Sequence, residues 1–187
     1  MKTLSVRSFQ SDDISNIVDY WFKNSDENLL QMGVNKTKLI SPLEYANTLQ
    51  AICNTPLEKV KSHYMIWLID NKPIGYNALK DIVRGEIAHM HLHMWNAEYR
   101  GKGYGARLFC MAAVKFYDMF NLKMILCEPR SSNPMPNKML TKIGFKKWKT
   151  YVSTSSELSE TCELNSYIID LNTATHFLDN ISKNDQI

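Results

Sequence analysis

A glycine-rich segment carries the clearest chemical signal in the sequence. Its three glycines alternate with other residues and two cations stand among them, in the order Arg100, Gly101, Lys102, Gly103, Tyr104, Gly105 and Ala106. Where a strand leads into a helix, glycines let backbone N–H groups approach an anion, and the helix dipole favours negative charge there. The spacing G-x-G-x-G differs from the dinucleotide fingerprint and from the P-loop. The segment therefore predicts a phosphate-binding loop that serves neither NAD nor ATP.

Three histidines alternate along the segment before this loop, at His89, His91 and His93. Successive side chains of a strand point to opposite faces, so we expect the three imidazoles to share one face. Imidazole titrates near neutral pH, which makes His89 and His91 candidate general bases, with Glu86 at the start of the same strand as the next candidate. Each histidine has the alternative of a packing role with its ring nitrogens bonded to backbone. The H-x-H spacing also permits a zinc site, although no third ligand is recognisable nearby.

The elements that must position these residues alternate between strand and helix patterns. Period-two patterns predict strands at residues 3–9, 63–69, 74–83, 86–95, 123–128, 145–152 and 164–171. Helical spacing predicts helices at residues 11–21, 41–52, 104–120 and 134–143, the second of which starts at a capping box formed by Ser41 and Glu44. Residues 23–40 read as irregular. We expect one domain over residues 1–171 and a polar tail over residues 172–187.

The composition is that of a single folded domain. The 187 residues are 44% hydrophobic and 22% charged, and the net charge is only +3 with scattered Lys and Arg, so we expect no nucleic-acid partner. No run approaches the roughly 18 apolar residues of a membrane span, and the first residues lack a signal-peptide core, so we expect no membrane partner. The four cysteines form no C-x-x-C pair, which fits a reducing, cytoplasmic setting.

The glycine-rich segment resembles the R-x-x-G-x-G/A motif of the GNAT superfamily of acetyl-CoA-dependent N-acetyltransferases, through Arg100, Gly103 and Gly105. Residues 73–75, 96–100 and 126–145 are also similar to the flanking segments of that family. The resemblance covers roughly residues 3–170 and includes the order of the elements. It implies an α/β fold of the α+β type, with a mixed, mostly antiparallel central sheet of six or seven strands flanked by about four helices.

The resemblance further implies acetyl-CoA as cosubstrate and no metal. The loop amides would hold its pyrophosphate, and the end of the histidine strand would pair with its pantetheine arm. The implied cofactor-binding residues are His93, Met94, Trp95, Arg100, Gly101, Lys102, Gly103, Tyr104, Gly105, Ala106 and Asn133. Asn133 stands where the family keeps an asparagine that touches the cofactor, and it equally suits the N-cap of a helix that starts at Pro134.

The proton acceptor and donor are less well defined. A primary alkylamine has a pKa of about 10, so it needs a base before it can attack a thioester at neutral pH. The family's glutamate base on the fourth strand falls at His89 here, and its usual tyrosine acid falls at Leu140, which leaves the acid open. Residues 128–130 (Glu-Pro-Arg) either face the acceptor or close a surface turn, and we favour the surface turn.

The resulting hypothesis is direct transfer of acetyl from acetyl-CoA to a primary amine of a small molecule or a protein. The alternatives are a non-catalytic CoA-binding sensor or interaction module, which Leu140 favours, and an acyltransferase for a siderophore-type hydroxylamine. The sequence leaves open the acceptor, the acyl chain length and the oligomeric state, a homodimer included.

Overall fold

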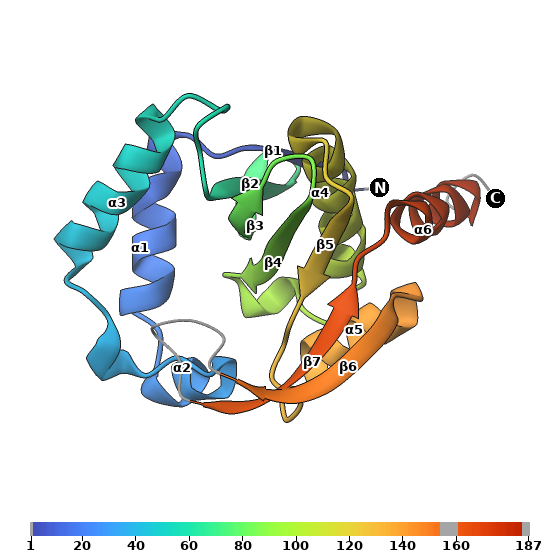
Figure 1. Ribbon diagram of the computed structural model, residues 1–187. Helices are drawn as coiled ribbons and strands as arrows, with labels where there is room; N and C mark the ends of the chain where they lie inside the picture. The colour runs from blue at the N-terminus through green and yellow to red at the C-terminus, as the bar shows by residue number, and fades with distance from the viewer. Residues whose placement is uncertain (1, 154–160, 185–187) are drawn as a thin grey trace.

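A seven-stranded mixed sheet runs through the centre of the computed structural model, which describes residues 2–153 and 161–184 (Figure 1). Its strands follow the order β1-β2-β3-β4-β5-β7-β6, and all neighbours are antiparallel except β4 and β5. The strands are β1 (Leu4–Ser8), β2 (His63–Ile69), β3 (Lys72–Val83), β4 (Ile87–Met94), β5 (Met124–Cys127), β6 (Lys146–Ser153) and β7 (Cys162–Ile168). The predicted mixed, mostly antiparallel sheet is confirmed.

Six α-helices and three short 3-10 turns surround the sheet in the described residues. The α-helices are α1 (Ile14–Phe22), α2 (Asp26–Met32), α3 (Pro42–Asn54), α4 (Tyr104–Phe120), α5 (Pro134–Ile143) and α6 (Leu171–Asn184). The 3-10 turns are η1 (Ser11–Asp13), η2 (Lys36–Lys38) and η3 (Ala97–Tyr99). No helix of the described chain combines the length and hydropathy that crossing a bilayer requires.

Two hydrophobic clusters fill the spaces on the two faces of the sheet. On one face α4 contributes Phe109 and Phe116, which are fully buried. On the other face Ile17 of α1 and Leu49 of α3 are equally buried, and these two helices stand apart from α4 in Figure 1. Strands β2 and β3 contribute buried residues to both clusters, because their side chains alternate between the faces. Residues of β4 with even numbers therefore pack toward α4, and those with odd numbers face α1 and α3.

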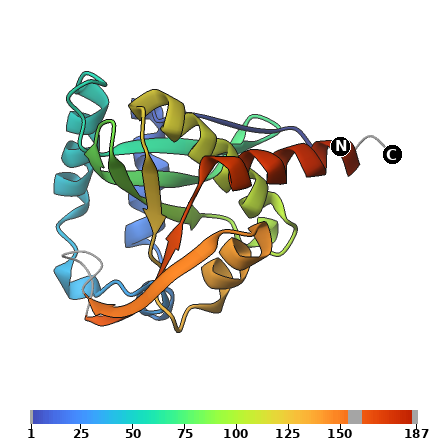
Figure 2. The ribbon, with the colours of Figure 1, turned by 45° about the vertical axis from the view of Figure 1, so that its right-hand side comes forward.

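Two segments differ from their sequence predictions. Residues 23–40, expected to be irregular, contain α2, which starts at the side-chain cap of Ser25 and ends at Gly33 in the left-handed conformation. Residues 172–184, predicted to be a polar tail, instead form most of α6, which packs beside α4 (Figure 2). Its Ala174, Phe177 and Leu178 have the i, i+3, i+4 spacing that makes an apolar stripe on an otherwise polar helix.

The parallel pair β4–β5 is short. Its register joins Ile87 to Met124, Ala88 to Ile125 and His89 to Leu126, and no pairing continues beyond His89. β4 itself runs on to Met94, where it pairs only with β3. The edge of β4 after His89 therefore keeps backbone groups that an extended ligand can pair with.

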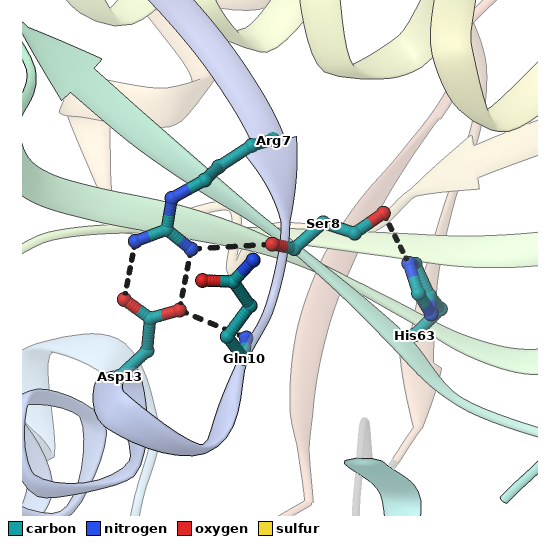
Figure 3. Close-up of polar contacts among 5 residues, drawn as sticks. All are labelled: Arg7, Ser8, Gln10, Asp13 and His63. Atoms are coloured by element: carbon teal, nitrogen blue, oxygen red, sulfur yellow. Dashed lines mark hydrogen bonds and ion pairs between the residues drawn. The ribbon is translucent and has the colours of Figure 1, made fainter.

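A buried ion pair fixes the start of α1 on β1, and α1 covers the odd-numbered face of β4. Arg7 donates from both terminal nitrogens to the Asp13 carboxylate, at 2.6 and 2.8 Å, and the Gln10 amide donates to the same carboxylate at 2.9 Å (Figure 3). Arg7 also donates to the Ser8 carbonyl oxygen at 3.2 Å. The Asp13 side chain is only 2% exposed, so its charge depends on these donors.

We expect Asp13→Ala to lower the free energy of unfolding by about 1–3 kcal/mol, since it leaves a guanidinium and an amide without their acceptor. Urea denaturation measures this change. Asp12→Ala is the matched control, because Asp12 is exposed in the same turn and should change stability by less than about 0.5 kcal/mol. Equal effects of the two substitutions would contradict a role of the Arg7–Asp13 pair in anchoring α1.

Candidate active site

The three histidines of β4 lie on one face of the sheet, as predicted. In the register with β3, His89 lies opposite Lys80, His91 opposite Ala78 and His93 opposite Tyr76. Ala78 and Tyr76 belong to the cluster under α1 and α3, so the histidines share that side. Their environments nevertheless differ, and the differences decide what each can do.

His89 lies where β4 and β5 part, and it is bound by a carboxylate. Its Nδ1 is 3.2 Å from Oε2 of Glu128, the residue that follows β5. The hydroxyl of Tyr151 on β6 donates to Oε1 of the same carboxylate at 2.9 Å. A cavity of about 220 Å³ opens beside this group, lined by Asp81, His89, Met90, His91, Leu126, Glu128 and Tyr151.

The electrostatics of this group favour a basic imidazole. The hydrogen bond to Glu128 raises the pKa of His89 above its ordinary 6.5, and this effect exceeds the lowering by partial burial. Burial works toward a higher pKa of Glu128, but the hydrogen bonds from His89 and Tyr151 outweigh it and lower that pKa to about 2. The Ser166 hydroxyl also lowers the pKa of Glu128, although it makes no hydrogen bond of good geometry among the described residues. Burial and the bond to Glu128 raise the pKa of Tyr151 to about 12, so its phenol stays a donor.

The other two histidines are held neutral. Burial lowers the pKa of His91 to about 4, and burial lowers that of His93 to about 3. The His93 ring packs against Trp21 and Tyr76, with centroids 5.0 and 4.8 Å away. Its Nδ1 is buried without a hydrogen-bond partner in the described part of the chain. His91 lines the cavity, whereas His93 serves mainly as part of an aromatic wall.

Glu86, the other predicted base, lies outside the cavity. It stands in the turn before β4, and its exposed carboxylate is 2.8 Å from the Lys123 ammonium. Its carbonyl oxygen accepts hydrogen bonds from the amides of Lys123 and Met124. Glu86 thus joins the start of β4 to the start of β5 and lies apart from the group of His89, Glu128 and Tyr151.

The glycine-rich loop has the backbone of an anion site. Gly101 and Gly103 have φ angles of +74° and +81°, a region that favours glycine, and space around both is open. Gly103 is the N-cap of α4 and offers no side-chain cap, so the first-turn amides of α4 remain free to bind an anion. Lys102 adds an exposed cation. The loop therefore has the backbone conformation that an anion site requires, and pyrophosphate binding by the segment from Arg100 to Ala106 stays a prediction.

Arg100 and Gly105 shape the corner between β4 and this loop. Arg100 donates from Nη2 to the carbonyl oxygen of Met94 at 3.2 Å, which ties the loop to the end of β4. A Cβ atom on Gly105 would lie 3.5 Å from Cε of Met94 and 3.9 Å from Sδ of Met139. The corner is thus closely packed on its inner side and open on its outer side.

Two predicted positions have structural roles. The Asn133 side chain accepts a hydrogen bond from the Met135 amide at 3.3 Å, so Asn133 is the N-cap of α5. Leu140 is fully buried in the core beside α4 and can transfer no proton. The position where the family keeps a tyrosine acid is therefore part of the hydrophobic core.

Glu128 and Tyr151 are the residues that sequence reasoning missed. The preference for a surface turn at residues 128–130 was wrong for Glu128, whose side chain is 13% exposed and turned toward His89. A signal existed, since a carboxylate directly after a buried strand that lies beside the histidine strand must fall near that strand. Tyr151 gave no such signal, because its place depends on the pairing of β6 with β7.

The described residues contain no group of three or more His, Cys, Asp or Glu side chains that can hold a metal ion. The H-x-H pair therefore lacks a third potential ligand in that part of the chain. The cavity chemistry is better described by the His89–Glu128 pair.

Comparison with known proteins identifies the family of the chain. A family model described as an acetyltransferase (GNAT) domain matches residues 3–146, well over half of the chain. The chain belongs to this GNAT acetyltransferase family, and acetyl-CoA is its cosubstrate. A search of curated protein sequences finds no match.

Solved structures share the fold at low sequence identity. A ribosomal L7/L12 α-N-protein acetyltransferase in complex with coenzyme A has a TM-score of 0.73 and 14% identity, covering 90% of this chain and 96% of its own. A spermidine N-acetyltransferase from Vibrio cholerae has a TM-score of 0.71 and 16% identity, covering 91% and 95%. A ribosomal-protein-S5-alanine acetyltransferase from Vibrio fischeri has a TM-score of 0.68 and 22% identity, covering 89% and 93%.

We expect Gly103→Asp to weaken CoA binding at least about tenfold, because a carboxylate would stand in the pyrophosphate site. Calorimetric titration with CoA measures the affinity. Gly85→Asp is a matched control, since Gly85 also has a positive φ angle (+74°) and open space around it but lies in the β3–β4 turn. Equal CoA affinity of the two variants would contradict the assignment of this loop as the pyrophosphate site.

Proposed function

We propose that the chain is an N-acetyltransferase that transfers acetyl directly from acetyl-CoA to a primary amine, with His89 as general base. The observation that carries the proposal is the His89–Glu128 hydrogen bond in a cavity at the point where β4 and β5 part. The family supplies the acyl donor, and the cavity supplies a place where an acceptor can meet it.

The proton transfer follows from the geometry of His89. Because its Nδ1 is directed to Glu128, its Nε2 is left for the acceptor, which arrives as an ammonium ion. His89 accepts one proton at Nε2, and the free amine then attacks the carbonyl carbon of the thioester supplied by acetyl-CoA. The C–N bond forms as the C–S bond breaks, and the second proton lost by nitrogen goes to the sulfur through solvent. A thiol pKa of about 8.5 makes the thiolate a fair leaving group, so the absence of a tyrosine at Leu140 is tolerable.

We further propose that the loop and the end of β4 hold acetyl-CoA. The amides of Gly101, Gly103 and the first turn of α4 would bind the pyrophosphate, with Lys102 supplying charge. The unpaired edge of β4 from His91 to Met94 would pair with the amides of the pantetheine arm. Arg100 would act by holding the Met94 carbonyl in place.

The nature of the acceptor is supported only as an amine. The neighbours named above act on protein amino groups and spermidine, and another is an aminoglycoside acetyltransferase in complex with coenzyme A. We infer a cytoplasmic location, supported by four free thiols at Cys53, Cys110, Cys127 and Cys162.

One observation favours the alternative of a non-catalytic CoA-binding module, namely the burial of Leu140 where the family keeps its acid. The His89–Glu128–Tyr151 arrangement argues for catalysis, because binding alone does not require a basic imidazole. The hydroxylamine alternative gains no support, since Arg130 is engaged with the Leu30 carbonyl at 2.8 Å and Asn133 caps α5.

We expect His89→Ala to lower kcat by about 10²- to 10⁴-fold while CoA affinity stays unchanged, because only the base is removed. The loss should shrink at high pH, where more of the amine is already deprotonated. Thiol release in the presence of an amine measures turnover. His176→Ala on the outer helix α6 is the matched control and should keep full activity.

The pH dependence tests the role of Glu128. The raised pKa of His89 places the acid limb of kcat/KM above pH 6.5, because the base must be deprotonated to act. Glu128→Gln removes the charge that raises this pKa, so the limb should move toward lower pH and the plateau should fall. Glu86→Gln, at an exposed glutamate outside the cavity, should leave the limb in place. An unmoved limb in Glu128→Gln would refute the proposed pair.

A further inference from the structure

The cavity beside His89 contains a carboxylate that the proposed mechanism does not use. Asp81 of β3 lines this cavity together with His89 and Glu128. Its side chain is exposed, and it makes no hydrogen bond or ion pair with the rest of the described chain. The negative charge of Asp81 stabilises positive charge nearby, and it contributes to the raised pKa of His89. Asp81 is thus an unpaired anion facing the site where the acceptor must bind.

A bulge in β3 turns Asp81 toward the cavity. Regular pairing with β4 ends at Lys80 opposite His89 and resumes at Val83 opposite Ile87. Asp81 has a φ angle of +51°, in the left-handed region that few residues other than glycine, Asn and Asp adopt. Strict alternation would direct Asp81 away from the face that Lys80 shares with the histidines. β-Bulges redirect side chains in this way and are common beside active sites.

The cations near the cavity make their closest contacts with other groups, although the charge of Lys80 also interacts with that of Asp81. Lys80 donates to the Tyr64 hydroxyl at 2.7 Å, and its ammonium lies 4.9 Å from the centre of that ring. Lys149 lies over the rings of Trp148 and Tyr151, at 4.6 and 4.4 Å. Among the described residues, neither lysine lines the cavity and no arginine does. With Glu128 bound to His89, Asp81 is the carboxylate of the described lining that remains for a ligand.

The dimensions and remaining lining suit a short carbon chain. A cavity of about 220 Å³ is smaller than the roughly 300–1,000 Å³ of sites for drug-sized ligands. Met90 and Leu126 give it apolar wall between its polar groups. A single alkyl chain with a polar group at each end matches this combination.

We propose that Asp81 selects acceptors that carry a second positive charge, and that the substrate is a small aliphatic diamine. One amino group reacts at His89 while the other, as an ammonium ion, pairs with Asp81. This proposal rests on the proposed function. In this proposal Asp81 determines specificity by binding the amino group that does not react. An ion pair between Asp81 and the reacting nitrogen would instead oppose the deprotonation of that nitrogen.

Steady-state kinetics with matched acceptors test the proposal. The acceptors are 1,3-diaminopropane, 1,4-diaminobutane and 1,5-diaminopentane, each beside the monoamine of equal carbon number. We expect the wild type to prefer the diamines, and Asp81→Asn to lose about fivefold in kcat/KM for the diamines, mainly through KM, with less than a twofold change for the monoamines. Asn tolerates the same left-handed backbone, so the variant should keep its fold. Asp179→Asn on α6 is the matched control and should behave as the wild type.

Calorimetric titration of the CoA-bound protein with the same amines separates the two proposals. Diamine binding that weakens in Asp81→Asn without any turnover in the wild type would support the Asp81 site and overturn the proposed function. Turnover with equal use of diamines and monoamines, or equal losses for both in Asp81→Asn, would overturn the Asp81 site alone. Neither binding nor turnover of any amine would overturn both.

Discussion

The early end of the β4–β5 pairing is the constraint on which the rest of the site depends. Two parallel strands that stayed paired would consume the backbone groups of β4 and close the sheet. Pairing instead ends at His89 and Leu126, while β4 continues five residues further to Met94. The sheet can part here because each strand has a second partner, β3 for β4 and β7 for β5. The gap therefore costs little pairing and exposes both a backbone edge and a side-chain cavity.

The same residue type has three different properties along one strand. His89 is at the point of separation, where Glu128 reaches it from the end of β5 and makes it more basic. His91 and His93 are deeper under α1, and burial keeps them neutral. The alternation that places all three on one face is a property of the strand. The carboxylate that distinguishes His89 comes from the end of another strand, 39 residues away in the chain.

Contacts between distant segments hold the helical layer of α1 and α2 on the sheet. Arg130, after β5, donates to the Leu30 carbonyl at 2.8 Å and packs so closely on Gly33 that a Cβ there would lie 2.7 Å from its Cδ. This contact joins the end of α2 to the half of the sheet that carries Glu128 and Tyr151. The Arg7–Asp13 pair anchors the other end of the same helical layer to β1. Two arginine contacts thus hold the helical layer of α1 and α2 against the sheet.

The sequence by itself determined the elements whose signals are local. The Ser41–Glu44 capping box begins α3 as predicted, and the alternation of His89, His91 and His93 gave their shared face. The glycine spacing predicted the loop, because positive φ angles at Gly101 and Gly103 are backbone requirements that a residue type satisfies alone. The apolar stripe of α6 is also local, but three residues in a polar segment were too few to recognise it without α4 beside them.

Only the tertiary structure decided which groups meet at the cavity. Glu128 follows β5, Tyr151 lies on β6 and Asp81 lies on β3, and their approach to His89 depends on strand order, register and one bulge. In the structure Glu86 lies apart from this group, and Asn133 caps the start of α5. The neighbouring sequence does not show whether a carboxylate or an amide side chain binds a histidine, a lysine or the backbone at the start of a helix. Its role is therefore fixed by long-range pairing, which no spacing within one segment encodes.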